Sequence, residues 1–323
     1  MPWWICYVRN MRRLKYAMAS TVQELTKRGL ISPRNDVLSN TCYETVVGSV
    51  AYGVADDLSD YDINGFYIPA ADCLFPHLRG HLMGFDKDPT TKALMKCYQD
   101  HHIWDQDACG GKGREYDLNI YSITQYIKLC MDNNPNMVDT LYTPEECVLH
   151  STDISDMVRD RRDMFLHKKC WAKYAGYSMQ QLHKMNGKNP EEGSKRWKLR
   201  ERYGYDVKYA YHLVRLLLEA EMILDEHCID IRRHREHLKA IRRGDVTEED
   251  VLAWACNKRL HLEKRFEAST LRAHPDREAI KQLLIDCLET HYGTLSALQT
   301  VKNEANAERA AMREIQAICE RVL

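Results

Sequence analysis

The stretch VVGSVAYGVADDLSDYDINGFY, residues 46–67, decides the fold of this chain. Its composition predicts a strand, a Gly48-Ser49 turn, a short helix, a polar loop and a second strand that carries Asp60 and Asp62. Because strand side chains alternate between two faces, the two aspartates are expected on the same face. Burying two adjacent carboxylates is costly unless a cation lies between them. The pattern therefore predicts that Asp60 and Asp62 bind Mg²⁺ or Mn²⁺.

The Gly48-Ser49 turn predicts a second feature of the same site. Its backbone N–H groups are expected at the start of a short helix, where anions are stabilised. A phosphate cradle and a metal-binding carboxylate pair, separated by about ten residues, can act together on one nucleoside triphosphate. The alternative is a surface loop whose aspartates cap helices and turns.

The combined motif resembles the signature of the DNA polymerase beta-like nucleotidyltransferase superfamily. Residues 48–53 and 59–67 are most similar to one branch, the predicted nucleotidyltransferases associated with RNA ligases of bacteria and large phages. In outline the resemblance covers residues 40 to 290. It implies that Gly48 and Ser49 hold the β- and γ-phosphates, and it adds Tyr52 to the nucleotide-binding residues. Val50 stands where relatives often carry a polar or basic residue, so a substrate contact is expected to be missing or supplied elsewhere.

A later strand supplies the third carboxylate that the resemblance implies. In residues 115–121, alternation places Asp117 with the polar residues of one face, and Leu118 and Ile120 on the other. Asp117 matches the superfamily position, and Glu115, which has the same parity, is the alternative. A third carboxylate helps to hold the metal and can take the proton from the attacking hydroxyl. The residues expected to be catalytic and metal-binding are thus Asp60, Asp62 and Asp117.

The strongest helical pattern spans residues 205–224, with an apolar stripe at steps of three, four, seven and eleven residues. Lys208, His212 and Arg215 lie on another face of this helix, spaced by four and three residues. Three aligned cations suit a triphosphate or an RNA backbone, and the alternative is a solvated face. Residues 206–216 also resemble the second recognisable motif of the family.

Composition sets the class of protein. The chain has 323 residues, 44% of them apolar, with a formal net charge of −1. This charge argues against strong non-specific nucleic-acid binding by the whole molecule, but not against a local basic groove. Twelve cysteines without paired spacing indicate a reducing cytoplasm, and no apolar run is long enough to span a membrane.

The expected fold is α+β: a polymerase-beta-like domain with a small mixed sheet, followed by an α-helical domain, with the cleft between them. The expected divisions are residues 1–40, an extension and helix; 41–150, the catalytic domain; and 151–323, the helical domain. Helices are predicted over residues 18–30, 123–131, 171–185, 251–268 and 277–292, with a connector over 31–40 and a strand over 96–104.

Histidines are further candidates for site residues. His101-His102 falls in the predicted strand, where a histidine either faces the cleft or makes a structural hydrogen bond. Cys73, His77 and His81 have the spacing of zinc ligands on a helix, but Pro76 and Gly80 interrupt that helix, so packing is expected instead.

The predicted function is Mg²⁺-dependent transfer of a nucleoside monophosphate (NMP) from an NTP to a hydroxyl. The acceptor is an RNA end, a protein side chain or a small molecule. Two alternatives are a nucleotide- or RNA-binding module without turnover and an antitoxin-like protein that modifies or sequesters a partner.

Overall fold

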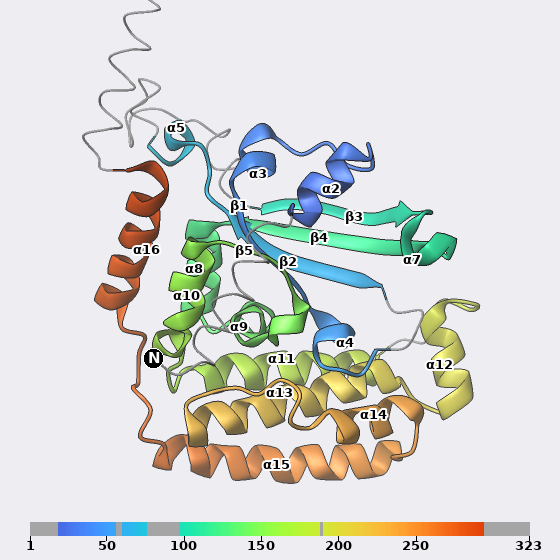
Figure 1. Cartoon of the computed structure of the whole chain (residues 1–323). Coiled ribbons are helices and arrows are strands. Elements are labelled where there is room, and N and C mark those ends of the chain that lie inside the picture. Colours follow the sequence, from blue (N-terminus) through green and yellow to red (C-terminus); the bar gives the residue numbers. More distant parts are fainter. Residues whose placement is uncertain (1–18, 56–59, 76–96, 188–189, 294–323) are drawn as a thin grey trace, which may run out of the picture.

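A five-stranded mixed sheet forms the centre of the fold (Figure 1), as seen in a computed structural model that describes residues 19–55, 60–75, 97–187 and 190–293. The strand order is β3-β4-β2-β1-β5. β2 and β4 run parallel, and the other neighbours run antiparallel. The strands are β1 (Thr41–Val46), β2 (Tyr61–Tyr67), β3 (Cys97–Asp105), β4 (Arg114–Ser122) and β5 (Val148–Ser151).

The two faces of the sheet have different cover. One face packs on α2 (Thr21–Lys27) and α3 (Asn35–Asn40) through buried residues such as Leu118 and Ile120. The other, here called the α8 face, packs Phe66 against α8 (Ile123–Met131) and α9 (Pro135–Tyr142). This helical cover lies over one end of the sheet, and the opposite end of β2 and β4 extends beyond it (Figure 1).

The first helices are fixed to β1 by a buried acid. Glu44 accepts hydrogen bonds from the backbone N–H groups of Thr21 (2.5 Å) and Val22 (3.2 Å) at the start of α2. The helix predicted over residues 18–30 is therefore real but shorter, and Gly29 follows it with φ +72°. The connector predicted over residues 31–40 was wrong in part, because α3 forms there and buries Val37 against the sheet.

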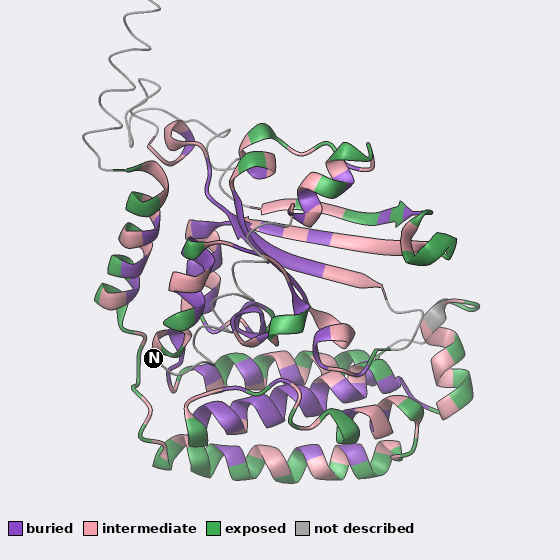
Figure 2. Ribbon diagram, viewed as in Figure 1, coloured by how far each residue is buried: buried purple, intermediate pink, exposed green. Residues whose placement is uncertain are grey.

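A layer of helices lies beneath the sheet and is built around α13 (Val207–Glu226), which is buried along most of its length (Figure 2). The predicted stripe Leu213, Leu216, Leu217, Ala220 and Leu224 is buried and forms part of this core. The other helices of the layer are α11 (Cys170–Met185), α12 (Lys195–Tyr203), α14 (Arg235–Arg243) and α15 (Glu248–Ala268).

The remaining helices after residue 151 pack elsewhere. α10 (Asp153–Asp160) and α16 (Arg277–Tyr292) contact each other and share a core with α8 and β1. The helices of the second half of the chain therefore belong to two layers, one built around α13 and the other packed with α8 and β1. Short elements complete the chain: α4 (Gly48–Ala51), α5 (Ala71–Leu74), α7 (Ala108–Gly111) and the 3₁₀ turns Glu145–Cys147 and Arg162–Phe165.

Side-chain caps set where several helices begin. Ser122, Asn134, Asp206, Thr247 and Asp276 each accept a backbone N–H from the first turn of the following helix.

The α+β fold class is confirmed. Within the described ranges, no helix has the length and apolar content needed to cross a bilayer. His77 and His81, for which packing and not zinc binding was expected, lie outside the described residues.

Candidate active site

The turn between β1 and β2 holds the side chain of Asp62. α4 begins directly after β1, at Gly48, whose φ is +67°. The backbone N–H of Val47 donates to the backbone oxygen of Asp62 at 2.8 Å. A Cβ atom added to Gly48 would lie 2.6 Å from Oδ2 of Asp62. The Asp62 carboxylate therefore lies directly against the Gly-Ser turn, at a position that only glycine leaves open.

The parallel pairing of β2 and β4 brings two of the predicted carboxylates together. Asp62 and Asp117 are register partners, so their side chains lie side by side on the α8 face. Asp60 was expected on the same strand, but β2 begins at Tyr61, so Asp60 lies in the segment just before it. The charge of Asp60 still reaches the site, because it contributes to the raised pKa of Asp62.

The electrostatics at Asp62 favour a bound cation. Burial and the negative charge of Asp117 raise the pKa of Asp62 to about 6, and the positive charge of Lys208 opposes them. The carboxylate is thus close to a second negative charge without full compensation. Oxygen donors in this arrangement fit a hard divalent ion such as Mg²⁺ or Mn²⁺.

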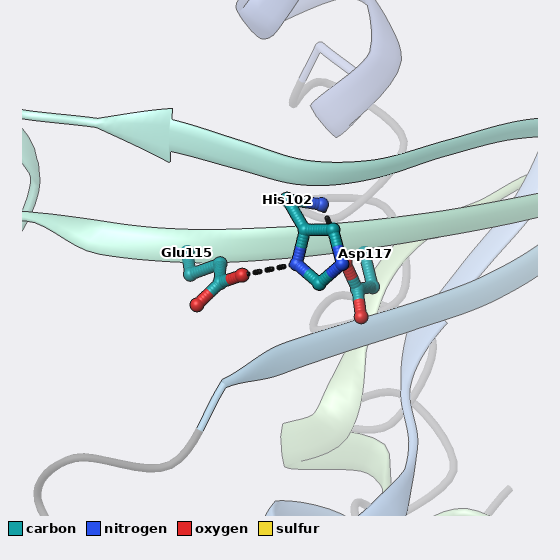
Figure 3. Close-up of side chains that lie close together, drawn as sticks. All are labelled: His102, Glu115 and Asp117. Carbon is teal, nitrogen blue, oxygen red and sulfur yellow. Dashed lines mark hydrogen bonds and ion pairs between the residues drawn. The ribbon is translucent and has the colours of Figure 1, made fainter. Parts of the chain in front are cut away.

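A bulge in β3 positions Asp117 further. The β3–β4 register shifts between Asp100 and Ile103, and His102 there has φ +59°. The backbone N–H of His102 donates to Oδ1 of Asp117 at 2.8 Å, while its Nδ1 lies 2.5 Å from Oε1 of Glu115. Figure 3 shows the His102 ring between these two carboxylates. The hydrogen bond orients Asp117 and leaves its second oxygen for another partner.

The same cluster brings Glu115 close to Asp117. One potential metal-ligand atom each from His102, Glu115 and Asp117 lies within 4.8 Å of the others. Glu115, the predicted alternative to Asp117, thus belongs to the same cluster. However, it pairs in register with Trp104 of the edge strand, whereas Asp117 pairs with Asp62. The position of Asp117 is therefore the more central of the two.

Trp104 is a site neighbour that the sequence did not indicate. Partners across an antiparallel pair share a face, so Trp104 lies on the α8 face with Glu115. Its side chain is 57% exposed although tryptophan is usually buried. The only signal available beforehand was its place in a predicted strand, which does not reveal exposure or register.

Two residues predicted to bind phosphate lie in the protein interior instead. Arg215 is buried and pairs with Asp139 (2.5 Å) and Glu219 (2.9 Å). Tyr52, also buried, donates its hydroxyl to Asp139 at 2.6 Å, and its ring centroid lies 4.5 Å from the Arg215 guanidinium carbon. These groups join α4, α9 and α13 in one ionic cluster, so Arg215 and Tyr52 do not present their polar atoms to a ligand.

The other α13 candidates differ from each other. Lys208 is exposed in the first turn of the helix, and its charge lowers the pKa of Asp62. His212 has a pKa well below its usual value, because its half-buried ring is desolvated and lies near the cations Arg215 and Lys208. His212 is therefore neutral at pH 7, and the three aligned cations expected from the sequence reduce to one exposed cation at the site.

Comparison with known proteins gives a family match and a similar phage protein. Residues 20–286 match the profile of the RlaP family, described as the RNA repair pathway DNA polymerase beta family. An uncharacterized 38.9 kDa protein of Enterobacteria phage T4, from the nrdC-mobD intergenic region, is 27% identical over 147 residues. That alignment covers 45% of this chain and 38% of the phage protein.

Proposed function

Since the chain belongs to the RNA repair pathway DNA polymerase beta family, we propose that it is a nucleotidyltransferase that moves an NMP from an NTP to a hydroxyl acceptor. The observation that carries this proposal is the side-by-side pairing of Asp62 and Asp117 beside the Gly48 turn. Carboxylates that converge next to a Gly-Ser turn suit phosphoryl transfer better than a purely structural role.

The proposed metal ligands are Asp60, Asp62 and Asp117. Divalent cations bound there supply charge neutralisation for the triphosphate and activation of the attacking hydroxyl. Asp117 is also the residue proposed to accept the proton of the acceptor hydroxyl, since the His102 N–H holds one of its oxygens and fixes the orientation of the other.

Gly48 and Ser49 are proposed to bind the β- and γ-phosphates through the backbone of the turn. Lys208 is proposed to neutralise phosphate charge from the opposite side, because it is exposed and its charge already acts on Asp62. In this arrangement the triphosphate lies between the end of the sheet and the start of α13, and pyrophosphate is the leaving group.

The proposed acceptor is an RNA end, which follows from the family description. The test is incubation with each of the four NTPs labelled at the α-phosphate, Mg²⁺ or Mn²⁺, and RNA oligonucleotides with different ends. Label transfer and pyrophosphate release are expected with the wild-type chain and not with Asp62→Asn. Absence of both products across all NTPs and metals, or equal activity in Asp62→Asn, would contradict the proposal. Tight binding of intact NTP without turnover would instead indicate a binding module.

A further inference from the structure

A basic cavity lies beside the candidate active site, between α11, α12 and α13. Its volume is about 470 Å³. The lining includes Lys184 at the end of α11, Arg196 and Arg200 on α12, and Asp206 and Tyr209 at the start of α13. Neither the proposed metal ligands nor the Gly-Ser turn contribute to it.

Basic side chains outnumber acidic ones among the described residues that line this cavity. Asp206 is the carboxylate of the lining, and it already caps α13 by accepting the N–H groups of Lys208 and Tyr209 at 3.1 and 3.2 Å. It also lies 3.7 Å from Arg196. The lining thus holds three cations and one acid; of the cations, Arg200 also donates to the backbone oxygen of Met185 at 3.2 Å. The helix α12 extends this surplus, since its sequence KRWKLRERY has five basic residues and one acidic residue.

An aromatic ring holds two of the cations in place. The guanidinium carbon of Arg196 lies 3.9 Å from the ring centroid of Tyr209, and the ammonium of Lys184 lies 5.8 Å from it. An aromatic ring attracts cations, but it carries no net charge and so does not neutralise them as a carboxylate does. Lys184 and Arg196 are thus fixed in direction and keep N–H groups for an anion from outside the chain.

The cavity and the candidate active site share the first turn of α13. Tyr209 lines the cavity, and the preceding residue Lys208 acts on the charge of Asp62. An extended anion can therefore pass from the cavity to the carboxylates along one helix end. Arg196 and Arg200 are one helical turn apart, with about 5–6 Å between Cβ atoms, which suits a ligand with repeated charges.

We propose that this cavity and α12 bind backbone phosphates of the single-stranded nucleic acid whose end is the acceptor. The inference rests on the proposed function for the identity of the acceptor, but binding can be measured without turnover. A repeated phosphate backbone fits a series of fixed cations better than a single nucleotide does. Because the whole chain has a net charge of −1, nucleic-acid binding requires a local basic site.

The test uses Lys184→Ala combined with Arg200→Ala, and fluorescence anisotropy of a labelled single-stranded RNA 20-mer between 50 and 300 mM KCl. The expected result is a ten- to hundredfold weaker affinity and a salt slope reduced by about 1 to 1.5, since single strands lose about 0.7 per phosphate contact. Titration of the same variant with ATP and Mg²⁺ is expected to give wild-type affinity. The matched control is Lys128→Ala with Lys281→Ala, which removes two exposed charges from α8 and α16 and is expected to bind RNA like the wild type.

Several outcomes overturn the inference. They are wild-type RNA affinity in the cavity variant, an equal loss in the control variant, no RNA binding by the wild-type chain, or binding of polyglutamate as tight as that of RNA. A loss of ATP affinity equal to the loss of RNA affinity would assign the cavity to the NTP. Thermal unfolding of each variant separates these outcomes from misfolding. If RNA binds through the cavity but no NTP turnover is found, the proposed function fails and this inference stands.

Discussion

The carboxylate of Asp62 occupies the space beside Gly48 in the turn between β1 and α4: a Cβ atom added to Gly48 would lie 2.6 Å from Oδ2 of Asp62. The turn proposed to hold phosphate and the carboxylate proposed to hold metal are therefore one structural unit. A change in the turn is therefore expected to alter the position of the carboxylate, and a change in the carboxylate is expected to alter the turn. The sequence motif does not reveal this contact, because its two halves are separate along the chain.

Substitution of Gly48 by alanine is expected to abolish NMP transfer and to weaken the binding of Mn²⁺. The new methyl group displaces the Asp62 carboxylate, and the residue also has to adopt φ +67°. Gly53→Ala is the matched control, because Gly53 has φ +69° but its nearest non-neighbouring atoms lie 3.7 Å away, on flexible arginine side chains. Both variants are expected to lose about 1–2 kcal/mol of stability from backbone strain. Calorimetric titration with Mn²⁺ distinguishes them; similar metal affinity in both would contradict the proposed coupling.

The pH dependence of stability is expected to reveal Asp62. In the folded chain its pKa is raised from 3.8 to about 6, so the folded state binds this proton more tightly than the unfolded state. This contribution to stability is complete below about pH 4 and is lost as the pH rises through about 6. Asp62→Asn is therefore expected to stabilise the metal-free chain at pH 7.5 by on the order of 1 kcal/mol, with little gain at pH 4.

Divalent metal supplies the converse measurement for Asp62. Mg²⁺ or Mn²⁺ is expected to raise the melting temperature of the wild-type chain at pH 7.5 and to do so less at pH 5, where protons compete for the carboxylate. Thermal scans at both values, with Asp62→Asn as control, provide the check. A shift of equal size at both pH values, or in the variant, would show that the metal binds elsewhere.

The two candidates for the third carboxylate can be separated by paired substitutions. Asp117→Asn is expected to lower the rate of NMP transfer by a factor of about 10² to 10⁴, the range typical for loss of a general base. Glu115→Gln is expected to cost less than tenfold, because Glu115 is the register partner of Trp104 at the edge of the sheet. Single-turnover transfer of labelled NMP measures both rates, and a larger loss in Glu115→Gln would exchange their roles.

Local patterns were sufficient to predict much of this fold. The period-two alternation of β4 and the apolar stripe of α13 give the same elements in the structure. Local patterns predicted the strand of Asp117, but its place in the same sheet as Asp62 was predicted from the family resemblance and not from these patterns. They did not predict α3, whose stability comes from covering the sheet through Val37 and not from a long helical period.

Burial accounts for the residues whose environment was predicted wrongly. Helical spacing places Lys208, His212 and Arg215 on neighbouring turns, but it does not show which of them α4 and α9 cover. The acids that pair with Arg215 come from α9 and from its own helix, and only the tertiary fold reveals the first of these. In the same way, the bulge that turns His102 toward Asp117 has no signature in the sequence.

Lys208 is expected to affect nucleotide binding without affecting stability. Its side chain is exposed, so Lys208→Ala should change the free energy of unfolding by less than about 0.5 kcal/mol. The affinity for NTP is expected to fall about tenfold or more, because a cation near the phosphates is removed. Isothermal titration with ATP and Mg²⁺ measures this, with Lys281→Ala on α16 as the exposed control; unchanged affinity would remove Lys208 from the proposed site.

Arg215 is expected to show the opposite behaviour. Arg215→Met leaves Asp139 and Glu219 buried without their cation, and burial already raises the pKa of both carboxyls. The variant is expected to lose about 3–5 kcal/mol of stability, the usual cost of removing one partner from a buried ion pair. Its control is Arg259→Met, since Arg259 on α15 pairs at the surface with Glu263 at 3.7 Å and should cost less than about 1 kcal/mol. Urea unfolding measures both variants. A variant at Arg215 that folds with wild-type stability but loses NTP affinity would return this residue to the phosphate-binding set, because a buried structural arginine cannot be removed without cost to the fold.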